Sequence, residues 1–179
     1  MHRHQDRGLQ VTRVARVITV STRAAAGLYE DTAGPAVAAA LRRQGLAVDP
    51  VVVVADGDPV ADAIRAAVTD GVALVVTCGG TGLSPDDQTP EQTRAVIGRD
   101  VPGIADYLRA ESWGALPAAA LSRAVAGIAE RTLVVNLPGS LAGATECVEI
   151  LGRLLPHALD QIVGGDHGGH HGQVQADES

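Results

Sequence analysis

The chain has 179 residues, which is long enough for one domain with a substantial core, and 46% of them are hydrophobic. Its net charge of −7 argues against broad binding to nucleic acids or anionic membranes, because both depend on basic patches. All 14 basic residues are arginines, and the lack of lysine excludes a Walker-A lysine and Schiff-base catalysis. Aromatic residues make up only 2%, which favours an α/β fold with an aliphatic core.

Cysteine usage and hydropathy indicate a cytoplasmic protein. Cys78 and Cys147 are the only cysteines, and they form no C-x-x-C pair. No apolar run reaches the ~18 residues of a membrane span, and the polar start lacks the apolar core of a signal peptide. We expect a disordered extension over 1–12, one folded domain over 13–165 and a disordered Gly/His-rich tail over 166–179.

Three apolar, β-branched runs in the first half of the chain are each followed by a helical pattern. The expected strands are 14–20, 48–54 and 74–77. The expected helices are 34–44, 58–70 and 90–97. Asp58 and Thr89 are the expected N-caps of the last two helices, because each precedes a proline that suits the first helical turn. Repeated strand–helix units predict a parallel sheet covered on both faces.

The second half of the chain continues this layered pattern. Two apolar runs, 121–128 and 132–137, are expected to pair as strands that a hairpin would join. The expected helices are 103–111, 142–155 and a short one from Pro156 that ends before Gly164.

The segment 72–91 carries the strongest functional signal. An apolar run ends there in Gly-Gly-Thr-Gly at 79–82, and glycines with positive φ let backbone N–H groups converge on an anion. A ligand would lie beyond the carboxyl end of the strand, where open α/β sheets bind ligands. A plain tight turn between strand and helix would explain the glycines as well. Asp87 favours the phosphate-binding interpretation, because a carboxylate beside a phosphate site needs a cation between them.

Five positions at the expected strand ends suit nucleotidyl transfer when they are taken together. They are Ser21, Asp56, the turn 79–82, Asp87 and Ser140. Each alone has a structural explanation, since Asp56 can form a turn, Ser140 can cap a helix and Asp87 can form an Asx turn. Together they offer an anion site for phosphates and two carboxylates for Mg²⁺, which would stabilise a departing pyrophosphate.

Two other chemistries find less support. The sequence around Ser140 lacks the G-x-S-x-G pattern of a nucleophilic serine, because Pro138 replaces the first glycine. His157 is the only histidine inside the expected domain, which leaves a serine triad one candidate base. The tail holds residue types that bind metals, namely Asp166, His167, His170 and His171. Their flanking glycines leave nothing to organise a site, so a solvated tail is the preferred interpretation.

A series of short motifs runs from about Arg13 to Gly165. They are Ser21 with Arg23, Asp31-x-x-Gly34-Pro35, the turn at Asp56, Thr77-x-Gly79-Gly80-Thr81-Gly82, Asp87-x-Thr89-Pro90-Glu91, Ser122-Arg123 and Asn136-Leu137-Pro138-Gly139-Ser140. In this order they resemble the molybdopterin-binding family of molybdenum-cofactor biosynthesis, which includes the MogA and MoaB proteins and the G domain of gephyrin. The MogA branch is the most similar in pattern.

The resemblance implies a three-layer α/β/α sandwich with a mostly parallel sheet, in a protein that is usually a homotrimer. It also implies adenylylation of molybdopterin by Mg-ATP, with release of pyrophosphate, alongside other proteins of cofactor biosynthesis. By position, Asp56 and Asp87 would be the catalytic carboxylates and would hold the Mg²⁺ ion. The implied substrate-binding residues are Ser21, Gly79, Gly80, Thr81, Gly82, Ser122, Arg123, Asn136, Pro138, Gly139 and Ser140.

Three positions depart from the family pattern. Ala33 replaces a usual serine, Asp86 often corresponds to a basic residue, and Ala124 stands where glycine is common. The second departure matters most, because an added carboxylate beside Asp87 weakens the attraction of anions. Two alternatives are a molybdopterin-binding carrier or scaffold without turnover, and a CinA-like nucleotide hydrolase, which the single-domain length disfavours.

Overall fold

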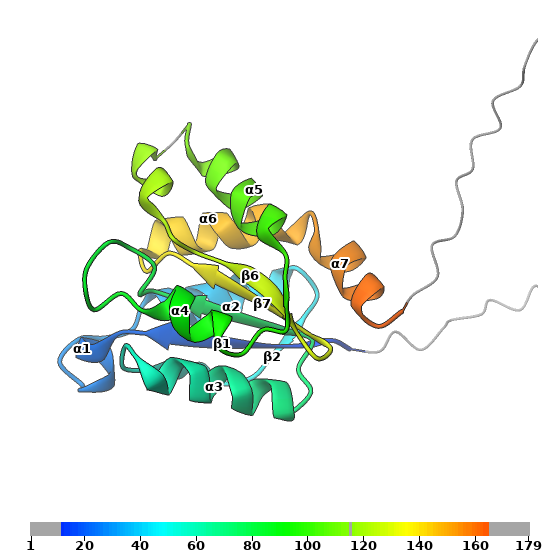
Figure 1. Ribbon diagram of the computed structural model, residues 1–179, viewed down its shortest axis with the longest axis horizontal. Helices are drawn as coiled ribbons and strands as arrows, with labels where there is room; N and C mark the ends of the chain where they lie inside the picture. Colours follow the sequence, from blue (N-terminus) through cyan, green and yellow to red (C-terminus); the bar gives the residue numbers. More distant parts are fainter. Residues whose placement is uncertain (1–11, 115, 165–179) are drawn as a thin grey trace, which may run out of the picture.

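A seven-stranded sheet forms the middle layer of the molecule (Figure 1). The computed structural model describes residues 12–114 and 116–164. The strands follow the order β2-β1-β4-β7-β6-β5, and β3 also pairs with β1. Their bounds are β1 Val14–Val20, β2 Ala47–Val48, β3 Val52–Val54, β4 Leu74–Cys78, β5 Arg99–Asp100, β6 Ala126–Ala129 and β7 Thr132–Leu137. Strand β6 pairs antiparallel with β7 and β5, and every other pairing is parallel, so the predicted mostly parallel sheet is confirmed.

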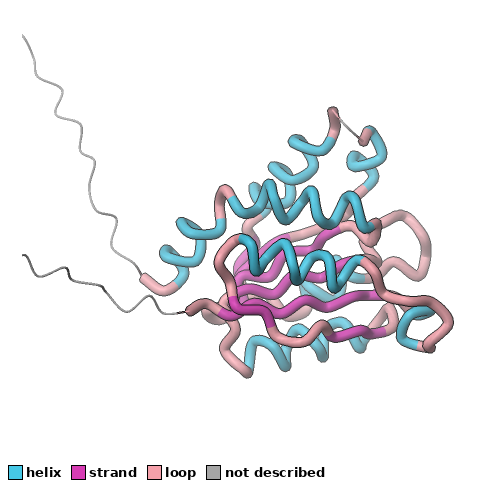
Figure 2. Tube along the Cα trace, turned by 180° about the vertical axis from the view of Figure 1, so that it is seen from behind, coloured by secondary structure: helices cyan, strands magenta, loops and turns pink. Residues whose placement is uncertain are grey.

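Helices cover both faces of this sheet (Figure 2). They are α1 Thr22–Ala25, α2 Ala33–Arg43, α3 Asp58–Thr69, α4 Thr89–Arg94, α5 Pro102–Ser112, the 3₁₀ helix η1 Pro117–Leu121, α6 Leu141–Gly152 and α7 Leu155–Ile162. Helices α2, α6 and α7 pack on one face with α5 beside α6, while α3 and α4 cover the other face. The predicted three-layer arrangement is therefore confirmed. Within the described residues, no helix is both long and apolar enough to cross a membrane.

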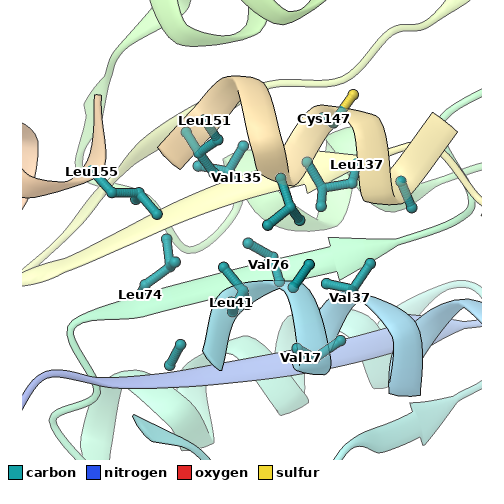
Figure 3. Packing of buried hydrophobic residues seen from close by; sticks show 14 of the residues in the cluster. Val17, Val37, Leu41, Leu74, Val76, Val135, Leu137, Cys147, Leu151 and Leu155 are labelled. Atoms are coloured by element: carbon teal, nitrogen blue, oxygen red, sulfur yellow. The ribbon is translucent and has the colours of Figure 1, made fainter. Parts of the chain in front are cut away.

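Successive residues of the same strands fill the two faces of the sheet. Val17 and Val76 pack against α2 and α6 in one cluster (Figure 3). Their chain neighbours Ile18 and Val75 pack against α3 in the other cluster. All four side chains are fully buried, which explains why these strands are continuous apolar runs in the sequence.

The single strand predicted over 48–54 is wrong. The chain pairs with β1 twice in this region, first as β2 and then as β3. Pro50 lies between the two pairings and has no N–H group to donate, so the ladder with β1 is interrupted there.

The strand predicted over 121–128 is confirmed only in its last part. Residues 117–121 form η1, and β6 begins at Ala126. In the intervening segment, the Arg123 N–H group donates to the Thr81 carbonyl oxygen over 2.9 Å. This segment is therefore bonded to the glycine turn after β4. The predicted pairing of β6 with β7 is confirmed, with a two-residue hairpin loop at 130–131.

Helix boundaries differ from the predictions by a few residues. Gly57, with a φ of 93°, is the N-cap of α3, and Asp58 is its first residue. Gln88 is the N-cap of α4, which begins with Thr89 and ends before residue 97. Helix α1 and strand β5 were not predicted, because elements of four and two residues carry no usable periodicity. The predicted tail, including Asp166 and its histidines, lies outside the described residues, as does the predicted N-terminal extension except for Thr12.

Candidate functional site

The predicted site residues follow the carboxyl ends of four neighbouring strands. Ser21 follows β1, Asp56 comes shortly after β3, the turn 79–82 follows β4, and residues 138–140 follow β7. The chain leaves β1 to pair on one side of it as β3, then returns to pair on the other side as β4. Ligands bind at such switch points in open α/β sheets, because the connections diverge there and leave a crevice.

Close packing of backbones explains the first glycine of the turn. Gly79 has a φ of 109°, and a Cβ atom at this position would collide with the Val20 carbonyl oxygen. A Cβ atom on Gly139 would lie 3.2 Å from the Gly79 Cα atom. The ends of β1, β4 and β7 thus meet without room for side chains at these two residues.

The two predicted carboxylates flank the rest of the turn. A Cβ atom on Gly80, whose φ is 64°, would lie 2.9 Å from Asp56 Oδ1 and closer still to Thr89 Oγ1. A Cβ atom on Gly82 would lie 2.8 Å from Asp87 Oδ2. The structure therefore brings Asp56 and Asp87 to the same glycine turn, as the sequence predicted.

Backbone N–H groups of the turn are available to a ligand. The Gly79 N–H group donates to the Leu137 carbonyl oxygen over 3.2 Å. Among the described residues, the N–H groups of Gly80, Thr81 and Gly82 have no acceptor. Three successive unpaired N–H donors form the kind of backbone site that binds phosphates.

Each carboxylate is also held by its own neighbours. Asp56 Oδ2 accepts a hydrogen bond from Thr22 Oγ1 over 2.8 Å, and the Asp56 N–H group donates back to that hydroxyl over 3.2 Å. Asp87 Oδ2 accepts from the Ser84 N–H group over 3.1 Å. The Asp87 bond runs back to residue 84 and closes a turn over 84–87, so it is not the Asx turn that the sequence allowed, and Asp56 is held by Thr22 from the end of β1. These bonds orient the carboxylates toward the glycines and do not compete with a role in binding.

Two pockets adjoin at this turn. The first has a volume of about 380 Å³ and is walled by α5, η1 and the start of α6, with the turn and residues 138–140 at its edge. The second has a volume of about 580 Å³ and is lined by Ser21, Asp56 and other polar residues near α1. Gly80 and Asp87 line both pockets. The arrangement can hold two ligands whose ends meet beside Asp87.

The first pocket has an apolar wall with few polar groups. Ser140 lies at its edge, where its hydroxyl caps α6 by accepting from the Gly143 N–H group over 3.3 Å. Burial raises the pKa of the Cys147 thiol to about 11, and the nearby Ser112 hydroxyl only partly opposes this shift. The Ser112 hydroxyl itself is buried, and it has no hydrogen-bond partner among the described residues. Sequence reasoning missed this wall, because the expected helix 103–111 was given no part in the site and residues 117–120 were given no element.

Of three other predicted residues, Asn136 and Ser122 line the first pocket and Arg123 does not. Asn136 is 1% exposed, and its amide donates to Thr77 and Thr93 hydroxyls over 2.9 and 2.8 Å, so it joins β7 to β4 and α4. Arg123 lines neither of the two pockets, and its guanidinium donates to the carbonyl oxygens of Gly82 in the glycine turn and Asp87 in the following loop.

Comparison with known proteins agrees with this geometry. Residues 16–157 match the family described as "Probable molybdopterin binding domain". A molybdopterin adenylyltransferase of Helicobacter pylori is 36% identical over 154 residues, which are 83% of this chain and 86% of that protein. A molybdenum cofactor biosynthesis bifunctional protein of Synechococcus elongatus is 39% identical over 86% of this chain, which spans only 49% of that protein.

Solved structures show the same fold. The molybdopterin biosynthesis Mog protein from Mycobacterium ulcerans superimposes with a TM-score of 0.80 and 47% sequence identity, over 84% of this chain and 99% of its own. The match to the family covers most of the chain and includes every strand end that forms the site. The chain therefore belongs to the molybdopterin-binding domain family.

Proposed function

We propose that this protein transfers the adenylyl group of Mg-ATP to molybdopterin, giving adenylyl-molybdopterin and pyrophosphate. The observation that carries the proposal is the junction of two pockets at Gly80 and Asp87. Transfer between two substrates requires that both be bound with their reacting groups adjacent, beside groups that stabilise the developing charge. The family match and the adenylyltransferase relative point to the same substrates.

The two pockets differ in a way that suits the two substrates. The apolar wall of the first pocket suits the flat pterin ring system, and the start of α6 at its edge offers a partially positive helix end to the pterin's phosphate. The polar second pocket suits ATP. The unpaired N–H groups of the turn would then bind phosphate oxygens at the junction.

The reaction follows from this placement. A phosphate oxygen of molybdopterin attacks the α-phosphorus of ATP, a new P–O bond forms, and the bond from the α-phosphorus to the pyrophosphate oxygen breaks. The glycine turn holds the phosphates in line and shields them from one another's charge through its N–H donors. No side chain has to accept a proton, because both reacting groups are phosphates that are ionised at neutral pH.

The residues at the turn fit a Mg²⁺ ion. Asp56 Oδ1 and the buried Thr89 Oγ1, which has no hydrogen-bond partner in the described structure, both lie beside Gly80. Mg²⁺ prefers oxygen ligands and commonly takes one or two carboxylates, with substrate phosphates and waters completing its shell. Asp56 and Asp87 supply two carboxylates, and the described residues contain no larger cluster of His, Cys, Asp and Glu that could hold a metal. When bound, Mg²⁺ would neutralise charge on the departing pyrophosphate.

We also propose that the protein works in the cytoplasm as a homotrimer, together with other proteins of molybdenum-cofactor biosynthesis. Both cysteines are free thiols, as a reducing compartment favours. Trp113, Leu116 and Leu121 are between 44% and 56% exposed around η1, and they offer apolar contact area to a second copy.

Calorimetry with molybdopterin and α,β-methylene-ATP, an analogue that cannot release pyrophosphate, tests the two-site arrangement. We expect both ligands to bind one protomer at once, each at a ratio of one. A carrier would bind molybdopterin alone, and a nucleotide hydrolase would bind the analogue alone. Mutually exclusive binding would also contradict the proposal.

A further inference from the structure

Arg123 ties three parts of the site together. Its N–H group donates to the Thr81 carbonyl oxygen over 2.9 Å, and its Nε–H group donates to the Gly82 carbonyl oxygen over 2.8 Å. Its Nη2 group donates to the Asp87 carbonyl oxygen, and its Nη1 group forms an ion pair with Glu91 in α4. One residue thus joins the glycine turn, the end of the acidic loop and the following helix.

The loop between Gly82 and Asp87 has little else to hold it. Leu83 is 66% exposed, so the loop's largest apolar side chain does not anchor it to the core. Inside the loop, the described structure shows only the bonds between Ser84 and Asp87, with the Asp87 N–H group donating to the Ser84 carbonyl oxygen over 3.0 Å. These bonds shape the loop but do not fix it to the sheet. The Arg123 side chain joins the loop to the segment before β6, through its bonds to the Gly82 and Asp87 carbonyl oxygens.

Each nitrogen of the Arg123 guanidinium is already bonded to the protein. All three of its nitrogens donate to protein oxygens. Partial burial acts to raise the pKa of Glu91, but the hydrogen bond and the charge of Arg123, together with a backbone hydrogen bond, outweigh it and lower that pKa. Glu91 is therefore ionised at neutral pH and competes with any phosphate for the same donors.

We propose that Arg123 is a positioning residue that holds the Asp87 carboxylate at the junction of the two pockets. Its part in catalysis rests on the proposed adenylyl transfer, whereas its hold on the loop does not. Arginine is needed because its planar fork reaches two carbonyl oxygens and a carboxylate at once, which the single ammonium group of lysine cannot do.

Hydrogen exchange measured by mass spectrometry tests the hold on the loop in Arg123→Lys, with Arg16→Lys as the matched control. Arg16 makes a similar set of ion pairs, with Asp49 and Asp70, but it lies in the first half of β1, away from the carboxyl ends of the strands. We expect the hydrogen-bonded amides of Ser84 and Asp87 to exchange at least about 10-fold faster in Arg123→Lys, with no change there in Arg16→Lys. Unchanged exchange in Arg123→Lys would overturn the proposal.

Binding and turnover separate positioning from phosphate contact. In Arg123→Lys, we expect the Kd of α,β-methylene-ATP without Mg²⁺ to stay within about twofold, because the phosphate-binding N–H groups are untouched, and kcat to fall about 100-fold. Glu91→Gln keeps the side-chain shape, and it should lower kcat by a smaller factor while also leaving the Kd unchanged. A raised Kd with normal loop exchange would mean that Arg123 binds phosphate, and would overturn the proposal. If the wild-type protein shows no transfer, the proposed function fails while the exchange experiment still decides the role of Arg123 in the loop.

Discussion

Asp87 and Gly80 show how single residues define the site. Asp87 lines both pockets and carries its carboxylate beside Gly82. Gly80 lies between the other carboxylate, Asp56, and the Thr89 hydroxyl, in a space that admits no Cβ atom. At this scale, the proposed function requires the carboxylate that the turn presents and the space that a methyl group on Gly80 would fill.

The first prediction concerns Asp87→Asn. Asparagine keeps an oxygen that can accept the Ser84 N–H bond, so the melting temperature should stay unchanged. Adenylyl transfer should fall about a thousandfold, because the lost charge weakens Mg²⁺ binding at the departing pyrophosphate. Molybdopterin binding should change little.

Initial rates and calorimetry check this prediction, with Asp86→Asn as the control. Asp86 lines only the second pocket, and loss of its charge should leave turnover intact and tighten ATP binding slightly. Turnover near the wild-type rate in Asp87→Asn would remove Asp87 from the mechanism.

The second prediction separates backbone strain from steric collision at the turn. Gly80→Ala and Gly45→Ala both place alanine at a positive φ, 64° and 88°, which costs on the order of 1 kcal/mol of stability. Only at position 80 would the new methyl group displace Thr89 and Asp56, since nothing lies within 4 Å at position 45. Urea unfolding should show a lower free energy of unfolding for both variants. Activity should fall only for Gly80→Ala, and an active Gly80→Ala would show that the position of Asp56 is not critical.

At the scale of elements, polar side chains fix the points where strands end and helices begin. Ser21 and Ser140 follow β1 and β7, and each hydroxyl caps the helix that begins there. Asp31 does a similar task for α2, where Oδ1 accepts from the Gly34 N–H group over 2.9 Å and Oδ2 accepts from Thr19 Oγ1 over 2.7 Å. The element boundaries that the motifs mark are thus built from polar contacts between side chains and backbone.

The third prediction tests whether Ser140 only caps α6 or also binds the phosphate. Glycine replaces a capping serine at a cost of a few tenths of a kcal/mol, whereas alanine costs about 1 kcal/mol. Ser140→Gly should therefore melt like the wild type, and Ser140→Ala should melt a few degrees lower. If Ser140 binds molybdopterin, both variants should weaken molybdopterin binding about 10-fold by calorimetry. Wild-type affinity in Ser140→Gly would leave capping as its whole role.

The sequence predicted elements well where burial dictates the residue pattern. Strands β1, β4 and β7 are apolar on both faces because both faces are covered, and the motif glycines identified the turn. Prediction failed where one residue interrupts an apolar run, either as a proline without an N–H donor or through a polar bond to another segment. Pro50 divides one strand into two, and the segment around Arg123 bonds to the glycine turn in place of the sheet. Pro50 is a local signal against a continuous strand, whereas the Arg123 bond to Thr81 joins residues far apart in the chain, so no local pattern records it.

At the scale of the whole molecule, exposed apolar side chains gather around the first pocket. Trp113 is the C-cap of α5 and is 54% exposed, with Leu116 and Leu121 exposed near it. A large ring left half in water suggests a contact between copies of the chain. The proposed trimer would cover this surface and shield the pocket beside it.

The fourth prediction is that Trp113→Ala weakens assembly more than it destabilises the protomer, since Trp113 is 54% exposed within one protomer. Light scattering should give a trimer mass for the wild type and smaller species for Trp113→Ala at low micromolar concentration. Tyr29→Ala removes an aromatic side chain of similar exposure, 57%, and should keep the trimer. A monomer mass for the wild type, or a Trp113→Ala trimer that simply melts earlier, would contradict the prediction.

The most direct test of the central claim is a single-turnover incubation of the wild-type protein with molybdopterin, ATP and Mg²⁺. Mass spectrometry identifies the pterin product, and an enzymatic assay counts the pyrophosphate. The account predicts adenylyl-molybdopterin and pyrophosphate in equal amounts, with neither formed when EDTA removes Mg²⁺. Unmodified molybdopterin, whether or not ATP is consumed, would contradict it.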